Sequence, residues 1–306
     1  MPGETKKDMP PAAKKLCLNY LSSKILLPYP PAVPDVDRTP YQMISFWKNI
    51  FLYLAPTDTE RIHLRRLCHL FHDSLGTTPD SRKGMYTVYP HPNHASLQSL
   101  MRRCHELYDE DPTKAPTIFF IKEGDHEINV NHLEINYPIK IIGAGRNKTF
   151  IRGGGFYIQG RKEVGKKVEL KDMTMRHTEK SGVYGNNGLS FLCDSMTFTQ
   201  CGGHGIWLFE TTGRLINCVI TQCGYSGIYC YENALIELKG SQTKIHGNGT
   251  RREGGCYGLR TWNTSSFIHL LHPLTKESVS TNNRDELNYG SKSGDVSVQI
   301  RTVDSF

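Results

Sequence analysis

The spacing of apolar residues along the chain changes from a helical period to a strand period. Within residues 41–75 and 96–111, apolar side chains recur every three or four positions, which predicts amphipathic helices. From residue 117 onward, short alternating runs of apolar and polar residues are separated by Gly, Asn and Pro, which predicts short strands joined by turns. A small helical part is therefore expected to precede a larger β domain.

The β part repeats itself. The segments TQCGGHGIWLFE (199–210) and TQCGYSGIYCYE (221–232) share Thr, Gln, Cys, Gly, Gly, Ile and Glu at equal positions. One column of equivalent positions is expected at a strand end, with steps of 22, 23 and 23 residues: Asp172, Asp194, Asn217 and Gly240. A second column holds glycine and continues after an insertion at residues 247–255: Gly182, Gly205, Gly227 and Gly258. A short period containing several strands predicts one rung of a parallel β-helix, in which every rung buries its inward side chains against the next.

The predicted fold class is therefore mainly β, a right-handed parallel β-helix solenoid with about 22–23 residues per rung and a small N-terminal α-helical module. The expected divisions are a disordered leader rich in Pro and Lys (1–40), a helical module (41–80), a linker and capping helix (81–115), the β-helix (116–275), and a last rung with a polar tail (276–306). The capping helix is expected to cover the N-terminal end of the stack.

A Gly-His-Gly triplet lies inside the repeat, at residues 203–205. This triplet resembles a motif in the active sites of pectin-cutting enzymes, but His204 occupies the position that Ser181 and Ser226 hold in the neighbouring rungs. We expect the recurrent glycine after it to serve backbone geometry, through either a positive φ or a close approach between rungs. The triplet then needs no catalytic explanation.

Glycoside hydrolysis requires two facing carboxylates, roughly 6.5–9.5 Å apart for an inverting mechanism. The acids nearest to His204 in the sequence are Glu179 and Glu210, and neither has a second carboxylate beside it in the sequence. The Asp-Asp pair of the polygalacturonase family does not occur. We therefore expect no glycoside hydrolase or lyase activity and assign no catalytic residue.

Strand alternation predicts an aromatic surface on the β-helix. If Ile206 and Leu208 point into the core, Trp207 and Phe209 point outward, and the same holds in neighbouring rungs. The predicted partner-binding face consists of Tyr184, Trp207, Phe209, Tyr229, Tyr231 and Trp262. Two interpretations remain open: the rings rigidify the sheet by stacking or are covered by the leader and tail, or they bind a partner protein or a sugar polymer.

Composition narrows the function classes only slightly. The net charge of +7, from 37 Lys and Arg against 30 acids, is spread along the chain and does not indicate nucleic acid binding. Nine cysteines without CxxC spacing favour reduced, buried thiols, such as a stacked pair at Cys201 and Cys223, in an intracellular protein of the cytoplasm or nucleus. No spacing typical of a metal site, no cofactor motif and no apolar run of membrane-spanning length occurs, so we expect no metal, no cofactor and no membrane insertion.

Residues 42–75 resemble an F-box, with Ile50-Phe51, Tyr53-Leu54, Pro56, Asp58, Leu67-Cys68 and Phe71 as the matching positions. The resemblance implies docking to a Skp-type adaptor of a cullin ubiquitin ligase through Ile50, Phe51, Leu54, Leu67 and Phe71. Residues 117–275 resemble the pectin-lyase-like β-helix domains that F-box proteins of the β-helix class place downstream to hold substrates. The combination implies a non-catalytic interaction scaffold that acts as a substrate receptor for an unknown protein, and the alternative is a carbohydrate-binding or carbohydrate-active protein.

Overall fold

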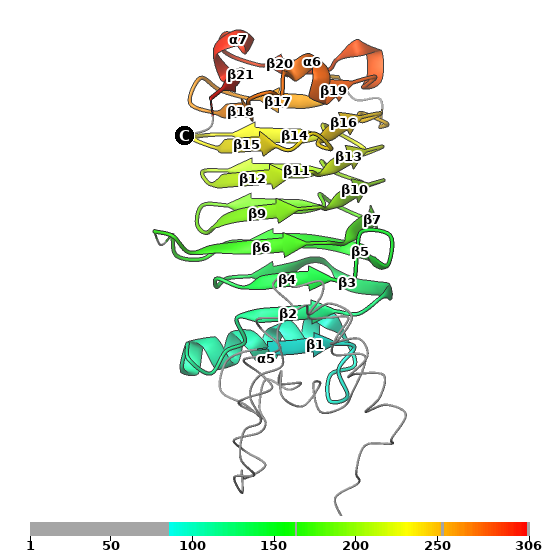
Figure 1. Cartoon of the computed structure of the whole chain (residues 1–306), viewed down its shortest axis with the longest axis vertical. Helices are drawn as coiled ribbons and strands as arrows, with labels where there is room; N and C mark the ends of the chain where they lie inside the picture. The colour runs from blue at the N-terminus through cyan, green and yellow to red at the C-terminus, as the bar shows by residue number, and fades with distance from the viewer. Residues whose placement is uncertain (1–85, 163, 252–253, 305–306) are drawn as a thin grey trace, which may run out of the picture. The chain divides into compact units, whose positions relative to one another are not determined.

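The computed structural model describes residues 86–162, 164–251 and 254–304, which form a stack of coils whose strands run parallel to one another (Figure 1). The predicted adaptor-docking residues, Ile50, Phe51, Leu54, Leu67 and Phe71, lie outside the described residues. In the middle of the stack each coil contributes one strand to each of three faces, which we call sheets 1, 2 and 3.

Within the described residues, sheet 1 consists of nine parallel strands in chain order. They are β1 (Tyr86–Tyr89), β2 (Ile118–Ile121), β4 (Lys140–Gly143), β6 (Lys167–Lys171), β9 (Ser190–Asp194), β12 (Thr212–Ile216), β15 (Leu235–Lys239), β18 (Phe267–Leu271) and β21 (Ile300–Val303).

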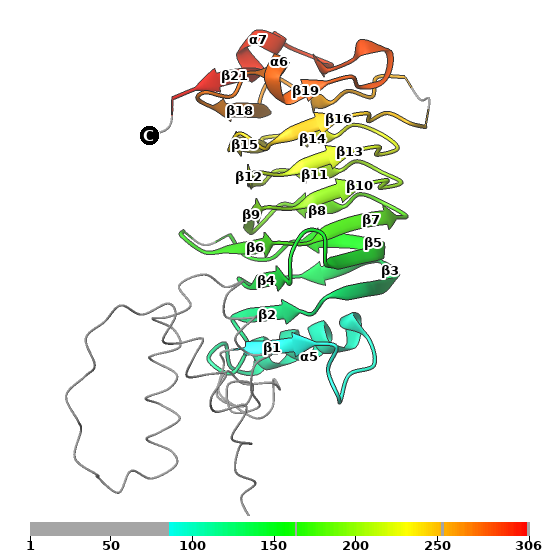
Figure 2. The same cartoon turned by 45° about the vertical axis from the view of Figure 1, so that its right-hand side comes forward.

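Sheets 2 and 3 are joined through two long strands of the first coils, β3 (Gly124–Ile135) and β5 (Thr149–Ile158). Sheet 2 continues with β7 (Thr174–Thr178), β10 (Thr197–Thr199), β13 (Val219–Thr221), β16 (Lys244–His246) and β19 (Ser280–Thr281), which lie one above another in Figure 2. Sheet 3 continues with β8 (Val183–Asn186), β11 (Ile206–Phe209), β14 (Ile228–Tyr231), β17 (Leu259–Thr261) and β20 (Tyr289–Ser291).

Single residues with left-handed backbone turn the chain from one sheet to the next. At the corner between sheets 1 and 2 they are Asp172, Ser195, Asn217 and Gly240, with φ of 54°, 55°, 52° and 87°. Short polar residues and glycine tolerate this conformation best, which explains why such residues recur at one position of the repeat.

The expected column of Asp172 and Asp194 is wrong by one residue. Asp194 pairs in register with Lys171, and Ser195 takes the corner position that corresponds to Asp172. The cause is the unequal length of the coils, since 23 residues separate Asp172 from Ser195 but 22 separate Ser195 from Asn217. Asp194 therefore lies on the outer surface of sheet 1, with its carboxylate 3.0 Å from the Lys171 ammonium.

The core is a continuous apolar column inside the coils. Alternate residues of the central strands, such as β9, β11 and β12, point inward. The large inward side chains Phe156, Phe191 and Phe198 are almost completely buried. Each fully buried large apolar side chain contributes about 1.5–3 kcal/mol relative to exposure. A single coil has no such partner surface, so the coils are stable only as a stack.

The helix α5 (Leu97–Glu110) packs on the N-terminal end of this core (Figure 1). Its N-terminus is closed by a capping box between Ser96 and Ser99. Its buried stripe, Leu97, Leu100, Met101, Cys104 and Leu107, belongs to the same apolar cluster as β2 and β3. Tyr108 on α5 also stacks on buried Tyr137, with ring centroids 4.5 Å apart. The helix therefore covers the apolar surface that the first coil would otherwise expose.

The coiled part extends further in both directions than residues 116–275. At the start, β1 pairs with β2 within a segment interpreted from the sequence as a linker, because a four-residue strand is too short to show a period. At the end, the short helices α6 (Lys276–Val279) and α7 (Val296–Gln299), with a 3₁₀ turn at Arg284–Glu286, alternate with β19, β20 and β21. These three strands pair with the preceding coil and complete a last rung.

Candidate functional site

The outer surface of sheet 3 carries a column of stacked aromatic rings. The strand register aligns Tyr157, Tyr184, Trp207 and Tyr229 across four consecutive coils. Neighbouring ring centroids are 5.1 Å apart for Tyr157 and Tyr184, and 4.4 Å for Tyr184 and Trp207, with nearly parallel planes. Trp207 and Tyr229 follow at 6.1 Å. Such pairs contribute about 0.5–1.5 kcal/mol each beyond the burial of their area.

A second, shorter column lies beside the first. Phe209 stacks on Tyr231 with a centroid distance of 5.5 Å, and Trp262 contacts Tyr231 edge to face at 5.9 Å. Trp262 also contacts Tyr229 at 6.1 Å, which joins the two columns. We call the whole set the aromatic face: Tyr157, Tyr184, Trp207, Phe209, Tyr229, Tyr231 and Trp262.

The structure brings together all six residues of the predicted partner-binding face, while Ile206, Leu208 and Cys230 between them are fully buried. Sequence reasoning missed Tyr157. The signal for it was present, because Gly155 precedes Phe156 and Tyr157 just as Gly182 precedes Val183 and Tyr184. An unequal first coil hid that correspondence.

The rings of the aromatic face are half-buried by one another, apart from Tyr229, which is 9% exposed. Because stacking occupies the ring faces in the Tyr157 to Trp207 column, mainly ring edges remain for solvent or a ligand. Burial raises the pKa of Tyr184, and it raises the pKa of Tyr229 to about 12. Both hydroxyls are thus neutral hydrogen-bond donors at physiological pH.

His204 connects adjacent coils through hydrogen bonds. The Ser181 hydroxyl accepts from the His204 backbone N–H (3.2 Å), and His204 Nδ1 accepts from the Ser226 N–H (3.1 Å). In the next coil the Ser226 hydroxyl accepts from the Tyr257 N–H (3.1 Å). His204 therefore performs the role that serine performs in the coils before and after it.

The glycine after His204 is explained by close approach between coils. A Cβ on Gly205 would lie 2.2 Å from Ile220 Cγ2 and 2.7 Å from the Gly227 carbonyl oxygen. Gly205 does not have a positive φ, so of the two expected explanations close packing is the correct one.

Burial lowers the pKa of His204 to about 3, and the nearby Arg260 charge acts in the same direction. The ring stacks on Tyr229 with centroids 4.8 Å apart, and its Nδ1 is an acceptor that protonation would eliminate. His204 is therefore neutral at physiological pH, with the proton on Nε2.

We expect His204 to make the protein sensitive to acid. The unfolded chain binds a proton at His204 near pH 6.5, whereas the folded chain binds it only near pH 3, so this contribution to stability is complete above about pH 6.5 and declines as the pH falls toward 3. The variant His204→Ser restores the side chain of the neighbouring coils. Its thermal midpoint should decrease less between pH 7.5 and pH 5 than that of the wild type.

Burial also lowers the pKa of His105, His132 and His269, so part of the acid sensitivity is common to both proteins. The measured quantity is therefore the difference between the two pH profiles, recorded by circular dichroism. Parallel profiles would contradict the assignment of His204 as an acceptor between coils.

The aromatic face contains no carboxylate at its outward strand positions. Its first column reads Tyr157, Tyr184, Trp207, Tyr229 and Arg260, and its second reads Asn186, Phe209, Tyr231 and Trp262. Glu232 follows Tyr231 at the turn, where it raises the pKa of the Tyr231 hydroxyl. A facing pair of carboxylates, which glycoside hydrolysis requires, is not formed at these positions.

Three cations border the aromatic face at its C-terminal end. The Arg260 guanidinium lies 5.1 Å from the ring centroids of both Tyr229 and Trp262. Lys292 Nζ lies 3.6 Å from the Trp262 ring centroid. Arg251, in the inserted segment, lies 5.6 Å from the ring centroid of Tyr225.

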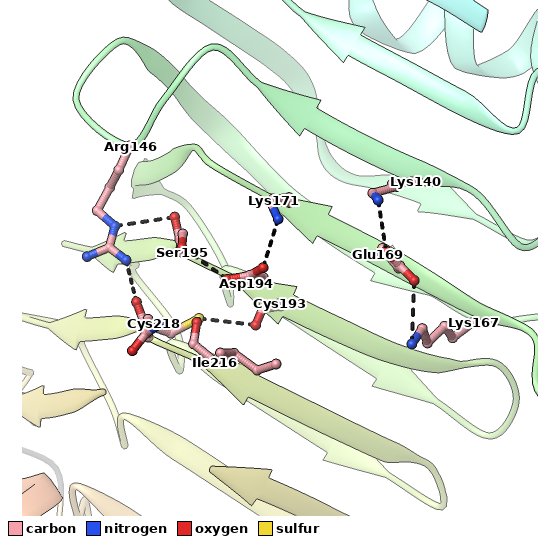
Figure 3. A network of polar contacts seen from close by, with 11 residues as sticks. Lys140, Arg146, Lys167, Glu169, Lys171, Cys193, Asp194, Ser195, Ile216 and Cys218 are labelled. Atoms are coloured by element: carbon pink, nitrogen blue, oxygen red, sulfur yellow. Dashed lines mark hydrogen bonds and ion pairs between the residues drawn. The ribbon is translucent and has the colours of Figure 1, made fainter. Parts of the chain in front are cut away.

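Sheet 1 has a different surface, with a groove of about 340 Å³ lined by β6, β9, β12 and β15. The charges around it are paired. Glu169 lies between Lys140 and Lys167 (Figure 3), with nitrogen–oxygen distances of 3.5 and 3.4 Å. Arg214 donates to Glu237 at 2.7 Å. Because these charges already have partners, the surface of sheet 1 is better explained by ion pairs that stabilise the sheet than by a binding site for a charged ligand.

Arg146 holds the coils together at the corner between sheets 1 and 2. It donates from Nε to the Ser195 carbonyl at 3.2 Å and from a terminal nitrogen to the Asn217 carbonyl, so that one side chain connects three coils (Figure 3). Both of these guanidinium hydrogen bonds go to backbone carbonyls of left-handed corner residues, which identifies a structural role.

The predicted stacked pair Cys201 and Cys223 lies inside the corner between sheets 2 and 3 and is fully buried. The same column continues through Asn248 and Asn283, which satisfy backbone groups of the preceding coils. Among the residues that the structure describes, no group of three or more His, Cys, Asp or Glu side chains is arranged to hold a metal ion. In the same part of the chain, no helix is long and apolar enough to cross a membrane.

Residues 117–272, slightly more than half of the chain, match the family model described as right handed beta helix region, and the chain belongs to this family. The predicted fold class is thereby confirmed. Among solved structures, the chain is similar to the A-module of the mannuronan C-5 epimerase AlgE4 from Azotobacter vinelandii, with a TM-score of 0.45 and 11% sequence identity. That alignment covers 66% of this chain and 59% of the other, so less than two thirds of the epimerase module is spanned. No curated protein matches the chain.

Proposed function

We propose that this protein is a non-catalytic recognition scaffold that holds a protein partner on its aromatic face. The observation that carries the proposal is the contiguous set of rings on sheet 3, which are half-exposed except for the buried Tyr229 and are fixed in position by stacking and by the packed core beneath. A preorganised surface rich in Trp and Tyr loses little side-chain entropy on binding, which is the property of protein-binding hot spots.

The geometry around His204 supports a role without catalysis. Its Nδ1 is already engaged by the Ser226 N–H, and its low pKa leaves it a poor proton acceptor near neutral pH. No carboxylate pair occupies the outward strand positions of the aromatic face. These positions therefore offer no acid that could protonate a leaving group and no base that could activate a water molecule.

A sugar polymer is the alternative occupant of the aromatic face. Sugars bind to aromatic side chains by lying flat on a ring, but Tyr184 has Tyr157 on one face and Trp207 on the other. Ring edges, hydroxyls and cations are better suited to the mixed polar and apolar surface of a protein segment. This orientation of the rings favours the protein partner.

We also propose, from the resemblance of residues 42–75 to an F-box, that Ile50, Phe51, Leu54, Leu67 and Phe71 dock to a Skp-type adaptor and thereby to a cullin ligase. A protein held on the aromatic face would then be the substrate of that ligase. Affinity purification from the native cell type, with Leu54→Asp as the control bait and mass spectrometry of the recovered proteins, tests this part separately.

The aromatic face is tested by binding of defined probes to the full chain. We expect a subset of an array of random-sequence twelve-residue peptides to bind, and Trp207→Ala to weaken that binding at least tenfold, the equivalent of about 1.4 kcal/mol for one hot-spot residue. Phe267→Ala is the matched control, because Phe267 is a half-buried aromatic on sheet 1.

The same array carries neutral and uronic-acid polysaccharides as competing probes. Binding of polysaccharides alone, lost in Trp207→Ala, would replace the protein partner by the carbohydrate alternative. Peptide binding that is equal in both variants would show that the partner lies elsewhere. Thermal unfolding of each variant verifies that the loss of one stacking pair has left the fold intact.

A further inference from the structure

Arg260 interrupts the stacked column of sheet 3 at its C-terminal end. The register places it directly after Tyr229, at the position where the four preceding coils have an aromatic ring. Its guanidinium lies between Tyr229 and Trp262, 5.1 Å from each centroid. A planar cation thus continues the stack of planar rings, and the column ends in a positive charge.

The charge of Arg260 has no carboxylate partner among the ion pairs of the described residues, and neither do Arg251 and Lys292. Arg260 Nε is also shielded from solvent and has no hydrogen-bond acceptor within the same part of the chain. Removing a charged group from water without a partner costs stability. On sheet 1, by contrast, Lys171 and Arg214 each contact a carboxylate.

The inserted segment shapes this end of the aromatic face. Gly255 packs against Arg260, since a Cβ at Gly255 would lie 3.4 Å from a terminal guanidinium nitrogen. The same segment places Arg251 over Tyr225, and Tyr225 contacts His204 with ring centroids 5.4 Å apart. His204 stacks in turn on Tyr229 beneath Arg260. The chain of ring contacts therefore connects the cations into one cluster.

The ring edges reinforce the preference of this cluster for negative charge. Aromatic rings are electron-poor at their edges, and stacking in the first column turns the edges outward. The hydroxyls of Tyr184 and Tyr229 are neutral donors at physiological pH. An extended anionic segment could therefore contact donors along the column and end at the guanidinium of Arg260, which binds carboxylates with two parallel hydrogen bonds.

We propose that Arg260, with Arg251 and Lys292, binds the carboxylates of an acidic peptide segment that lies along the aromatic face. This inference rests on the proposed function and specifies the chemistry of the partner. Single-stranded nucleic acid is disfavoured as the occupant because its bases bind by stacking on open ring faces, and the faces of Tyr184 are already occupied.

The test uses pairs of synthetic twelve-residue peptides that contain Tyr, Leu, Gly and Ser together with either Glu and Asp or the uncharged Gln and Asn. Binding to the full chain is measured by fluorescence anisotropy. We expect the acidic member of a pair to bind at least tenfold more tightly, and Arg260→Gln to abolish that preference. Arg214→Gln removes a paired cation of sheet 1 and should leave the preference unchanged.

A second variant, Arg251→Gln combined with Lys292→Gln, changes only exposed side chains and should reduce the preference severalfold even if Arg260→Gln fails to fold. Equal binding of acidic and uncharged peptides, still lost in Trp207→Ala, would overturn this inference and leave the proposed function intact. Peptide binding that is unchanged in Trp207→Ala would overturn both this inference and the proposed function. If a single-stranded oligonucleotide bound more tightly than the acidic peptides, and this binding depended on Arg260, the ligand would be a nucleic acid. That result would overturn the proposal of an acidic peptide.

Discussion

Gly205→Ala is expected to lower the stability of the β-helix by about 3 kcal/mol, the upper part of the usual range for overpacked cores. For a domain of this size the thermal midpoint should fall by about 6–12 °C. The new Cβ would lie 2.2 Å from Ile220 Cγ2 and 2.7 Å from the Gly227 carbonyl oxygen. Ile220 is fully buried and β-branched, and the carbonyl belongs to the next coil, so neither atom moves without separating two coils.

Gly254→Ala is the matched control, because a Cβ there would meet nothing within 4 Å and its φ lies outside the positive region. Thermal unfolding followed by circular dichroism, with denaturant titration as a second measure, should separate the two variants clearly. Similar midpoints for Gly205→Ala and Gly254→Ala would mean that the coils at this corner can move apart at little cost.

The glycine column shows how much of the fold can be predicted from the repeat. The regular spacing of Gly182, Gly205 and Gly227, with steps of 23 and 22 residues, predicts stacked coils. The strand register agrees, with Gly258 in line after the insertion. Periodicity reports that a position is restricted but not what restricts it. Positive φ and steric contact both select glycine, and only coordinates distinguish them.

The misplaced column of Asp172 and Asp194 shows the limit of the same reasoning. A coil of 23 residues beside one of 22 shifts the apparent alignment by one position, and one position exchanges a corner residue for an outward strand residue. Chemical similarity between two aspartates suggested the wrong alignment. The correct alignment is determined by the hydrogen-bonded register of the strands, and side-chain identity contributes little to that register.

The candidate site was predictable in its membership but not in its geometry. Alternation along β11 and β14 was enough to place Trp207 and Tyr229 outside and Ile206 inside. Whether the rings present faces or edges depends on side-chain torsions and on packing between coils, which leave no pattern in the sequence. The proposed role of Arg260 could not be predicted for a related reason, since it depends on the lack of a carboxylate partner for Arg260 among the ion pairs of the described residues.

Asn248→Ala is expected to lower the free energy of unfolding by about 3 kcal/mol, because it would leave several buried polar groups without a hydrogen-bond partner. Asn248 is 1% exposed, accepts from the Cys223 N–H at 3.1 Å and donates to the Ile220 carbonyl at 3.2 Å. It also donates to the Asn283 side chain at 3.0 Å. The inserted segment follows directly, so water cannot replace these bonds without opening the corner.

Asn248 and Asn283 make the same pattern of hydrogen bonds one coil apart. Asn283 donates to the Ile245 carbonyl at 3.2 Å and accepts from the Asn248 N–H at 3.2 Å, as Asn248 does for the coil before it. Loss of Asn248 should therefore also loosen the inserted segment that carries Arg251 and Gly255, which hydrogen exchange measured by mass spectrometry would detect as faster exchange in residues 247–255. Asn129→Ala, on the exposed side of β3, should change neither the stability nor the exchange. An Asn248→Ala protein as stable as this control would show that the coils at this corner are held by apolar packing alone.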